Sequence, residues 1–485
     1  MQHLLAAAAF LFAPACLSSH ESELVALDPV APIAAQEKVA PAKEPIALAR
    51  LGHGKPVCGL GKEFHAGRRA ELMRRAGEEL LVFRGLAGAR ENLAFRQDKN
   101  FWYLSGVESP DAALVLDGKT KQEILLLPEQ NLGKEIWDGE IWDAADAWVK
   151  ELTGIPDVRP IERLVPVLEE LLGGRESLGT SLAASIVLAG SYDAAGPFEK
   201  DQASDALDGR VSRERALAQK LEEKLGVSVF DVYPTLVEMR LVKTPEEVAA
   251  MRRAARAGSL AHIEAMRSTR PGIGEWELDG VMSFVQVREG AFGKAYEAIV
   301  GSGANACVLH YTANDRRMQK GEVVLIDYGP EVDHYTTDIT RSWPTDGTFT
   351  PRAAELYDAV LASQQAGLAA CKPGATIKDV SKACKDVFLA RGLDKFMRHG
   401  PCHYIGLEVH DPGDTKKVFV PGMVFTVEPG LYDTQAGIGI RIEDVVAITA
   451  DGCEVLSALA PKERAEVEKT VQAEGILDRL AASGE

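Results

Sequence analysis

Residues 321–329 read GEVVLIDYG and residues 422–430 read GMVFTVEPG, so the chain carries one pattern twice. In both stretches an apolar run typical of a buried strand ends in a carboxylate, Asp327 in the first and Glu428 in the second. Packing can explain one acid in such a place. Two acids in the same frame, with glycines at the same offsets, predict a duplicated unit with pseudo-twofold symmetry and a partner that both acids bind.

A second acid follows each stretch across a predicted hairpin. Asp338 mirrors Asp327 about a turn centred between residues 332 and 333, so the two carboxylates are expected to lie opposite each other. Glu443 mirrors Glu428 in the same way about the midpoint of the second hairpin. Two hairpins are therefore predicted to bring four carboxylates together.

Four carboxylates at one place would repel each other and lose hydration, so they must take up protons or bind cations. Two divalent ions would cancel the four charges, and oxygen ligands with one imidazole suit Mn²⁺, Co²⁺ or Zn²⁺. Candidate imidazoles lie in HGPCHYIGLEVH, which contains His399, His403 and His410, and in ACVLHYT, which contains His310. The glycine and proline between His399 and His403 argue against a helical zinc pair.

Each of these residues has an ordinary alternative when it is considered alone. An acid after an apolar run is usually a turn residue, and a single histidine is usually a hydrogen-bonding group. Arg441, near the middle of a predicted strand, is more often a salt-bridge partner than a substrate ligand. Four acids in a repeated frame, with histidines between the two hairpins, favour a metal site over these alternatives.

The composition of the whole chain limits the classes of partner. Of its 485 residues 46% are hydrophobic and 26% charged, as in a soluble globular protein with two domains. The 54 basic and 72 acidic residues give a net charge of −18, which argues against nucleic acid and anionic membrane surfaces as partners. The seven cysteines show no CxxC spacing and are predicted to be thiols, with an isolated disulfide left open in an exported protein.

The first 57 residues are predicted to be a leader and a linker. Residues 4–15 form an apolar run of signal-peptide length that is too short to span a bilayer, and Cys16 follows it. Residues 1–16 are therefore predicted to be a signal peptide, either cleaved on export to the periplasm or lipid-anchored at Cys16. The alternative is an unstructured start of a cytoplasmic protein. Residues 17–57, rich in Ala, Pro and Glu, are predicted to be a disordered linker.

Two domains are predicted after this linker. In residues 58–235 strand-like runs alternate with amphipathic helices, which predicts an α/β domain. A long helix is predicted to open residues 236–478, because Thr244 can cap it, Pro245 suits its first position and Glu247 completes a capping box. This second domain holds all the candidate site residues.

The second domain resembles the pita-bread metallopeptidases, which include aminopeptidase P, prolidase and methionine aminopeptidase. The segments that carry the resemblance are IVGSGANACVLHYT, VVLIDYGPEVDHYTTDITRSWP, HGPCHYIGLEVHD, VFTVEPGLY and GIGIRIEDVV. In the first domain, FRQDKNFWYLSGVESPDAALVL resembles aminopeptidase P rather than prolidase. The resemblance implies an α/β N-terminal domain followed by an α+β pita-bread (creatinase/aminopeptidase) catalytic domain.

The resemblance also implies roles for single residues. The implied metal ligands, of which Asp338 and Glu443 would bridge two ions, are Asp327, Asp338, His403, Glu428 and Glu443. The implied catalytic residues are Glu428, which would shuttle a proton, and His310 and His410, which would hold the scissile carbonyl. The implied substrate-binding residues are His399, Tyr432 and Arg441. Because all five ligands are present, the metal-free relatives of this fold are disfavoured.

The expected function is that of a manganese-type Xaa-Pro aminopeptidase, a hydrolase that removes the N-terminal residue from peptides with proline in second position. Two divalent ions are implied, with Mn²⁺ first and Co²⁺ or Zn²⁺ as alternatives. Relatives imply a homo-oligomer, dimer or tetramer, with peptides as substrates and membrane contact only through a lipid on Cys16. The alternative functions are an Xaa-Pro dipeptidase (prolidase) and a catalytically silent binding module on the same fold.

Overall fold

The computed structural model describes residues 58–88, 94–185 and 192–482. The predicted signal peptide, its lipid-anchor residue and the predicted linker, which together make up residues 1–57, lie outside the described residues. Within the described ranges no helix combines the length and the apolar composition needed to cross a membrane.

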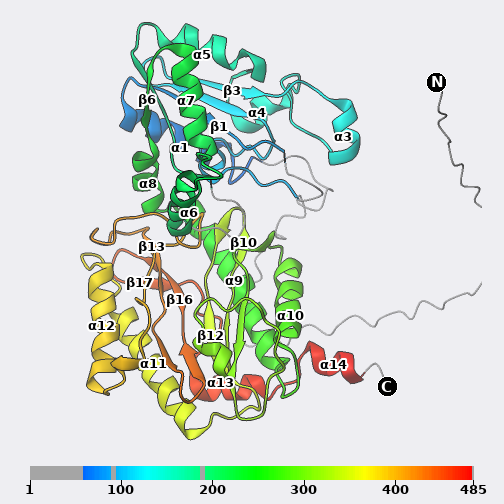
Figure 1. Cartoon of the computed structure of the whole chain (residues 1–485), viewed down its shortest axis with the longest axis vertical. Helices are drawn as coiled ribbons and strands as arrows, with labels where there is room; N and C mark the ends of the chain where they lie inside the picture. The colour runs from blue at the N-terminus through cyan, green and yellow to red at the C-terminus, as the bar shows by residue number, and fades with distance from the viewer. Residues whose placement is uncertain (1–57, 89–93, 186–191, 483–485) are drawn as a thin grey trace, which may run out of the picture. The chain divides into compact units, whose positions relative to one another are not determined.

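A six-stranded mixed sheet forms the centre of the first half of the described chain (Figure 1). In spatial order its strands are β4 (Asp157–Pro160), β3 (Gln122–Leu127), β2 (Ala113–Asp117), β1 (Leu80–Arg84), β5 (Ser177–Thr180) and β6 (Ser228–Asp231). The neighbours β1, β2 and β3 are antiparallel, whereas β4, β5 and β6 join in parallel. This arrangement confirms the predicted α/β class of the N-terminal domain.

The side chains of β1 alternate between two hydrophobic cores. Leu81 and Phe83 pack in one cluster, and Leu80 and Val82 pack in the other. The helices of this half are α1 (Lys62–Ala76), α2 (Lys99–Ser105), α3 (Leu132–Asp138), α4 (Trp148–Thr153), α5 (Leu164–Leu172), α6 (Tyr192–Ser204), α7 (Arg213–Leu225) and α8 (Tyr233–Leu241). The cluster of Leu80 also contains residues of α5 and α7, which therefore cover one face of the sheet.

The second half opens with the long helix α9 (Pro245–Arg267) at the predicted capping box. The Thr244 hydroxyl accepts a hydrogen bond from the Glu247 amide, and the Glu247 carboxylate accepts one from the Thr244 amide. The predicted boundary between residues 235 and 236 falls inside the continuous helix α8. One hydrophobic cluster contains residues from both sides of that boundary.

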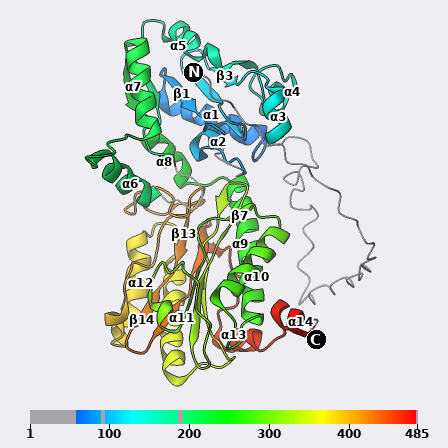
Figure 2. The ribbon, with the colours of Figure 1, turned by 45° about the vertical axis from the view of Figure 1, so that its right-hand side comes forward.

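Short antiparallel sheets and flanking helices make up the rest of this half. The strands are β7 (Gly293–Lys294), β8 (Ile299–Ser302), β9 (Val323–Asp327), β10 (Pro330–Val332), β11 (Tyr335–Thr336), β12 (Thr340–Pro344), β13 (Val424–Val427), β14 (Gly430–Asp433), β15 (Ile438–Arg441), β16 (Asp444–Ile448) and β17 (Cys453–Val455). The helices are α10 (Glu275–Arg288), α11 (Pro351–Ala370), α12 (Ile377–Ala390), α13 (Arg464–Val471) and α14 (Ile476–Ala482). The pairs α9/α10 and α11/α12 flank the strands on opposite sides (Figures 1 and 2).

The two copies of the repeated frame have the same local structure. Gly321 and Gly422 both have positive φ, 80° and 92°, a backbone conformation that glycine adopts at little cost. Each is followed two residues later by a buried strand, β9 or β13; Asp327 is the last residue of β9, and Glu428 directly follows β13. The predicted duplication therefore agrees with the fold.

The predicted register is correct for the second hairpin and wrong for the first. Pairing of β13 with β16 and of β14 with β15 continues one register, in which Glu428 lies opposite Glu443. In the first hairpin β9 pairs with β12 so that Asp327 lies opposite Thr340 rather than Asp338.

The turn of the first hairpin explains this difference. Its central residues are Asp333 and His334, with φ of 50° and 64°, so the turn is centred one residue later than predicted. Two consecutive positive φ values are typical of a type I′ hairpin turn, whose backbone twist matches that of the strands. Asp and His tolerate positive φ better than most residues.

Candidate metal centre

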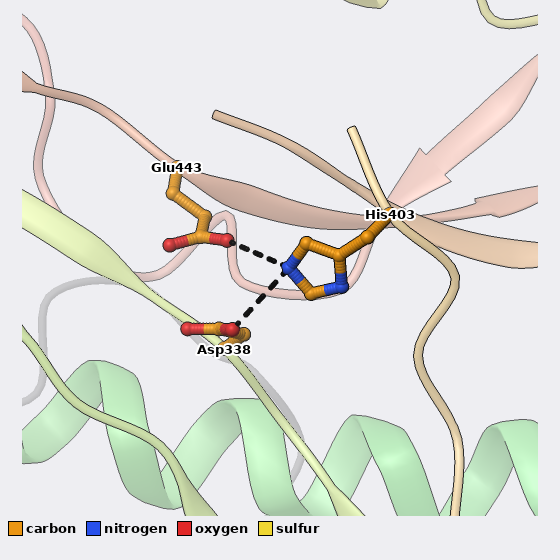
Figure 3. Close-up of side chains that lie close together, drawn as sticks. All are labelled: Asp338, His403 and Glu443. Atoms are coloured by element: carbon orange, nitrogen blue, oxygen red, sulfur yellow. Dashed lines mark ion pairs between the residues drawn. The ribbon is translucent and has the colours of Figure 1, made fainter. Parts of the chain in front are cut away.

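The four predicted carboxylates and His403 meet between the two hairpins. The His403 Nε2 atom lies 3.5 Å from Asp338 Oδ2, 3.4 Å from Glu428 Oε1 and 3.9 Å from Glu443 Oε1. Figure 3 shows His403 pointing between the carboxylates of Asp338 and Glu443. One ligand atom from each of these three residues lies within 4.8 Å of the others, as the donors of a single ion must.

Backbone hydrogen bonds place these side chains. The His403 amide donates to the Thr426 hydroxyl (3.1 Å), and the Thr426 amide donates to the His403 carbonyl (2.9 Å), so His403 is held beside β13. The Glu443 amide donates to the Thr340 carbonyl (3.0 Å), and the Thr340 hydroxyl donates to Glu443 Oε2 (2.7 Å). Thr340 belongs to the first hairpin and Glu443 to the second, so these bonds join the two copies at the site.

Asp327 is the fourth carboxylate of the cluster, and Tyr296 links it to Asp338. The Tyr296 hydroxyl lies 2.5 Å from Asp327 Oδ1 and 2.5 Å from Asp338 Oδ1. Because a hydroxyl carries one proton, it can donate to only one of the two carboxylates at a time. Sequence reasoning missed Tyr296, which lies outside the repeated frame and is 31 and 42 residues away from these acids.

Burial and mutual repulsion perturb the acids. Burial, then the neighbouring Asp338 charge, raises the pKa of Asp327 to about 8. Burial and the charges of Asp338, Glu428 and Asp327 raise the pKa of Glu443 well above its ordinary value. Burial opposes the charge on His403, but Asp338 and Glu428 outweigh it and raise the pKa of His403 to about 9. Burial also opposes ionisation of Asp338, yet bonding to His403 keeps its pKa below the ordinary value.

These residues fit divalent cations. The Oε1 atom of Glu443 is buried and has no hydrogen-bond partner among the described residues. Such an atom loses its hydration without replacement, and a cation would restore the lost interaction. Carboxylate oxygens with one imidazole nitrogen form a donor set that Mn²⁺, Co²⁺ and Zn²⁺ accept. Bound divalent cations would both interact with the unsatisfied oxygen and offset the repulsion that raises the pKa values of the acids.

Three of the other predicted residues form a chain that reaches Asp327. The Arg441 guanidinium donates to Asp327 Oδ2 (2.5 Å) and to the Tyr432 hydroxyl (2.9 Å). The Tyr432 hydroxyl lies 2.7 Å from His399 Nε2, and His399 Nδ1 lies 3.6 Å from Glu428 Oε2. Arg441 is thus both the salt-bridge partner that its strand position suggests and part of the wall of the site.

The two remaining predicted histidines, His410 and His310, differ in their position relative to the cluster. The ring of His410 lies 4.1 Å from the ring of His403, centroid to centroid, so the structure brings it to the cluster. His310 is exposed and forms no hydrogen bond or ion pair with any residue in the described ranges. Its neighbours Leu309 and Tyr311 pack against the hydrophobic cluster that contains Tyr432, so His310 lies on a loop beside the site.

Comparison with known proteins identifies the family. Residues 249–450 match the model of metallopeptidase family M24, and residues 65–179 match that of the aminopeptidase P N-terminal domain. The Xaa-Pro aminopeptidase of Escherichia coli K12 is 33% identical over 446 residues, which cover 84% of this chain and 97% of the relative. The chain belongs to the aminopeptidase P family. Human Xaa-Pro aminopeptidase 3 is 32% identical, with 77% of this chain and 76% of the relative covered.

Solved structures of aminopeptidase P have the same fold. A putative aminopeptidase P from Bacillus anthracis is 28% identical, with a TM-score of 0.76 over 86% of this chain and 100% of that chain. Aminopeptidase P from E. coli with the inhibitor Pro-Leu is 30% identical, with a TM-score of 0.71 over 87% and 99%. The chain is therefore a metallo-aminopeptidase, a hydrolase with an N-terminal aminopeptidase P domain and a pita-bread catalytic domain. The prolidase alternative is not favoured.

Proposed function

We propose that this chain removes the N-terminal residue from peptides whose second residue is proline, with two divalent ions bound and Mn²⁺ as the ion that it uses. The observation that carries the proposal is the buried cluster of four carboxylates and His403, in which Glu443 Oε1 has no hydrogen-bond partner among the described residues. Relatives named Xaa-Pro aminopeptidase support the substrate.

The five clustered residues would hold the ions, with Asp338 and Glu443 shared between both. The terminal ligands would be Asp327, His403 and Glu428. When bound, two divalent ions lower the pKa of a water molecule and polarise a carbonyl. Mn²⁺ is proposed over Zn²⁺ because the set is rich in oxygen and contains a single imidazole nitrogen.

The protein's own residues would move the proton and hold the peptide. The carboxylate of Glu428 is accessible enough, at 14% exposure of its side chain, to take a proton from the attacking water and pass it to the leaving proline nitrogen. His410, beside His403, would donate a hydrogen bond to the oxygen of the scissile carbonyl, and His310 would do so from its exposed loop.

Selectivity for proline would come from the shape of the site rather than from a hydrogen bond. A peptide bond before proline has no amide hydrogen, and the ring fixes φ. An enzyme that selects proline needs flat side chains around the rigid ring. It must not place a hydrogen-bond acceptor where an amide N–H would be, because that acceptor would stay unpaired. His399 and Tyr432, 2.7 Å apart through Nε2 and the hydroxyl, offer such a wall.

A peptide panel tests this proposal. Metal-depleted protein is refilled with Mn²⁺, Co²⁺ or Zn²⁺ singly and assayed on Xaa-Pro-Xaa and Xaa-Ala-Xaa tripeptides and on Xaa-Pro dipeptides. We expect kcat/KM to be at least about tenfold higher on the proline series, with Mn²⁺ giving the highest rate. Equal rates on the two tripeptide series would contradict proline selectivity. Activity confined to dipeptides would instead support prolidase, and metal binding without turnover would support a silent module.

Export and assembly are further parts of the proposal. The apolar run at residues 4–15 and Cys16 support a mature chain that starts at or near Cys16, free in the periplasm or lipid-anchored. Mass spectrometry of the native protein tests this, and an unmodified Met1 would contradict it. Similarity to aminopeptidase P supports a dimer or tetramer, which light scattering can measure.

A further inference from the structure

A hollow of about 410 Å³ adjoins the candidate metal centre. Its volume is within the range of small-ligand pockets. Its lining residues are Lys385, Asp394, Met397, Arg398, His399 and Gly400. His399 belongs to both places, because its Nδ1 atom lies 3.6 Å from Glu428 Oε2 and its ring also lines the hollow. The hollow therefore borders the site at His399.

Side-chain exposure increases from Glu443 toward the residues that line the hollow. Glu443 has 2% of its side chain exposed, Glu428 has 14% and His399 has 20%, and Arg398 beyond them is exposed. An aminopeptidase binds the N-terminal residue at the metal ligands, so the rest of the peptide must run outward. The residues that follow proline would pass His399 and enter the hollow.

The hollow contains two cations without acidic partners. Arg398 and Lys385 are exposed, and neither forms an ion pair with a residue in the part of the chain that the structure describes. Asp394 lines the same hollow and also forms no ion pair there. Among the residues that line the hollow, two are cations and one is an anion, an excess of positive charge on a chain whose net charge is −18.

The Arg398 guanidinium is held so that it can bind an anion. Its Nη1 group donates to the carbonyls of Lys395 (2.9 Å) and Met397 (3.2 Å), which are neutral acceptors. Its other N–H groups form no hydrogen bond with a residue that the structure describes, and guanidinium groups bind carboxylates strongly because they can donate two parallel hydrogen bonds.

We propose that this hollow is a subsite for a carboxylate of the peptide beyond the proline, bound by Arg398 and Lys385. The carboxylate is either the C-terminus of a short peptide or an acidic side chain. The proposal rests on the proposed function, since it assumes that peptides are cleaved at the metal centre. It assigns the chain a preference for short or acidic Xaa-Pro peptides.

Four tetrapeptides separate the two sources of the carboxylate. They are Ala-Pro-Ala-Ala with a free C-terminus, the same peptide as an amide, Ala-Pro-Asp-Ala amide and Ala-Pro-Lys-Ala amide. With the metal-loaded full chain at low ionic strength, we expect a carboxylate to raise kcat/KM about two- to fivefold over the neutral amide, as for exposed ion pairs. A lysine should lower it, and high salt should remove both effects. A gain from the free C-terminus alone or from aspartate alone identifies the source.

Matched variants test the residues. Arg398→Ala and Lys385→Ala should each reduce the ratio of kcat/KM between carboxylate and amide peptides, through KM rather than kcat, because the contact is made equally in the ground and transition states. Asp394→Asn should increase the ratio. The control is Lys382→Ala, because Lys382 lies on the same helix as Lys385, pairs with Asp386 at 2.5 Å and does not line the hollow.

The outcomes distinguish this proposal from the proposed function. Cleavage of all four peptides at one rate, or a charge preference that survives Arg398→Ala and Lys385→Ala, would overturn the subsite and leave proline cleavage intact. Failure to cleave any proline peptide would overturn both. A salt-sensitive preference that the variants reduce and the Lys382→Ala control keeps would establish the subsite.

Discussion

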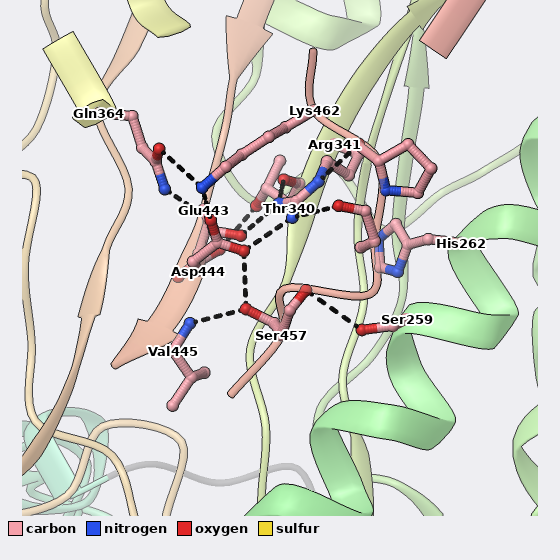
Figure 4. A network of polar contacts seen from close by, with 12 residues as sticks. Ser259, His262, Thr340, Arg341, Gln364, Glu443, Asp444, Val445, Ser457 and Lys462 are labelled. Carbon is pink, nitrogen blue, oxygen red and sulfur yellow. Dashed lines mark hydrogen bonds and ion pairs between the residues drawn. The ribbon is translucent and has the colours of Figure 1, made fainter. Parts of the chain in front are cut away.

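Glu443 and Asp444 are consecutive residues with similarly buried side chains, 2% and 0% exposed, but their surroundings differ. Asp444 accepts hydrogen bonds from Arg341 (2.7 Å), Lys462 (2.7 Å), Gln364 (2.6 Å) and Ser457 (2.7 Å), as Figure 4 shows.

Glu443 accepts one hydrogen bond, from Thr340, and its second oxygen has no hydrogen-bond partner among the described residues. Its neighbours in the site include three more acids. Consecutive residues of an extended chain point to opposite sides, so one peptide step separates the two environments.

Burial alone therefore does not decide how an acid behaves. Burial opposes ionisation of both groups, but the charges of Arg341 and Lys462 outweigh it and hold the pKa of Asp444 below its ordinary value. No cation compensates Glu443 to that degree, and its pKa is raised. A buried acid with cationic partners is part of the scaffold, and one without them is expected to bind a ligand.

The two environments are also mechanically connected. The Arg341 guanidinium bonds Asp444 through Nη2, and its Nη1 group donates to the carbonyls of Thr340 and Glu443. Thr340 in turn bonds the Glu443 carboxylate. The network of Arg341 and Asp444 thus holds the backbone of Glu443 in place. Substitutions can separate the structural role of Asp444 from the proposed metal-binding role of Glu443.

The largest effect is expected for Glu443→Gln. A bridging ligand would be lost, so metal content should fall and kcat/KM should drop at least about a thousandfold, roughly 4 kcal/mol of transition-state stabilisation. The metal-free protein should become more stable, because a buried acid without a cation is removed. Elemental analysis, peptide assays and urea unfolding measure these changes. Full metal content with full activity would remove Glu443 from the ligand set.

The opposite pattern is expected for Asp444→Asn. Removal of one partner leaves Arg341 and Lys462 uncompensated, which should lower the free energy of unfolding by about 3 kcal/mol. The folded fraction should keep its metal, because Asp444 faces away from the site. Urea unfolding and elemental analysis of the same sample measure both quantities. A stable Asp444→Asn variant without metal would show that the two roles are not separate.

The dependence of stability on pH should differ between the metal-free and the metal-bound protein. With its folded pKa raised to about 8, Asp327 holds a proton in the native state that it loses when unfolded, so stability falls as pH rises from about 4 to 8. The pKa of His403, raised to about 9, contributes stability that is complete below about pH 6.5 and lost by about pH 9.

Because of both groups, the melting temperature of the metal-free protein should fall as pH rises from about 6 to 9. Metal binding needs deprotonated ligands, so the gain in melting temperature on adding Mn²⁺ should grow over the same range. Melting curves recorded with and without chelator at the two ends of this pH range measure the gain. A gain that shrinks as pH rises would contradict the assignment of Asp327 and His403 as ligands.

Part of this site could be predicted from the sequence because its signals are local. Two glycine-framed runs fix where Asp327 and Glu428 stand, and the second hairpin has a regular register, so Glu443 was placed correctly. The turn centre of the first hairpin was predicted one residue too early, because the turn residues Asp333 and His334, both with positive φ, are weaker hairpin signals than Asn-Gly.

The contacts between distant segments could not be predicted. Tyr296 bridges two acids from outside the repeated frame, and no spacing in the chain indicates it. The difference between Glu443 and Asp444 depends on Arg341 and Lys462, which are 103 and 18 residues away from Asp444. Sequence patterns show which acids are buried, whereas only the fold shows which of them meet a cation.

The smallest effect is expected for Lys462→Met, which tests how the compensation of Asp444 is shared. The Lys462 side chain is 21% exposed and Arg341 is fully buried, so solvent already screens part of the Lys462 charge. Asp444 would keep Arg341, Ser457 and Gln364, and the loss should be about 1 kcal/mol in urea unfolding. The control Arg464→Met, which removes an exposed pair with Asp358, should cost less than about 0.5 kcal/mol. If Lys462→Met costs as much as Asp444→Asn, then Arg341 alone does not keep the acid ionised, and both cations are needed.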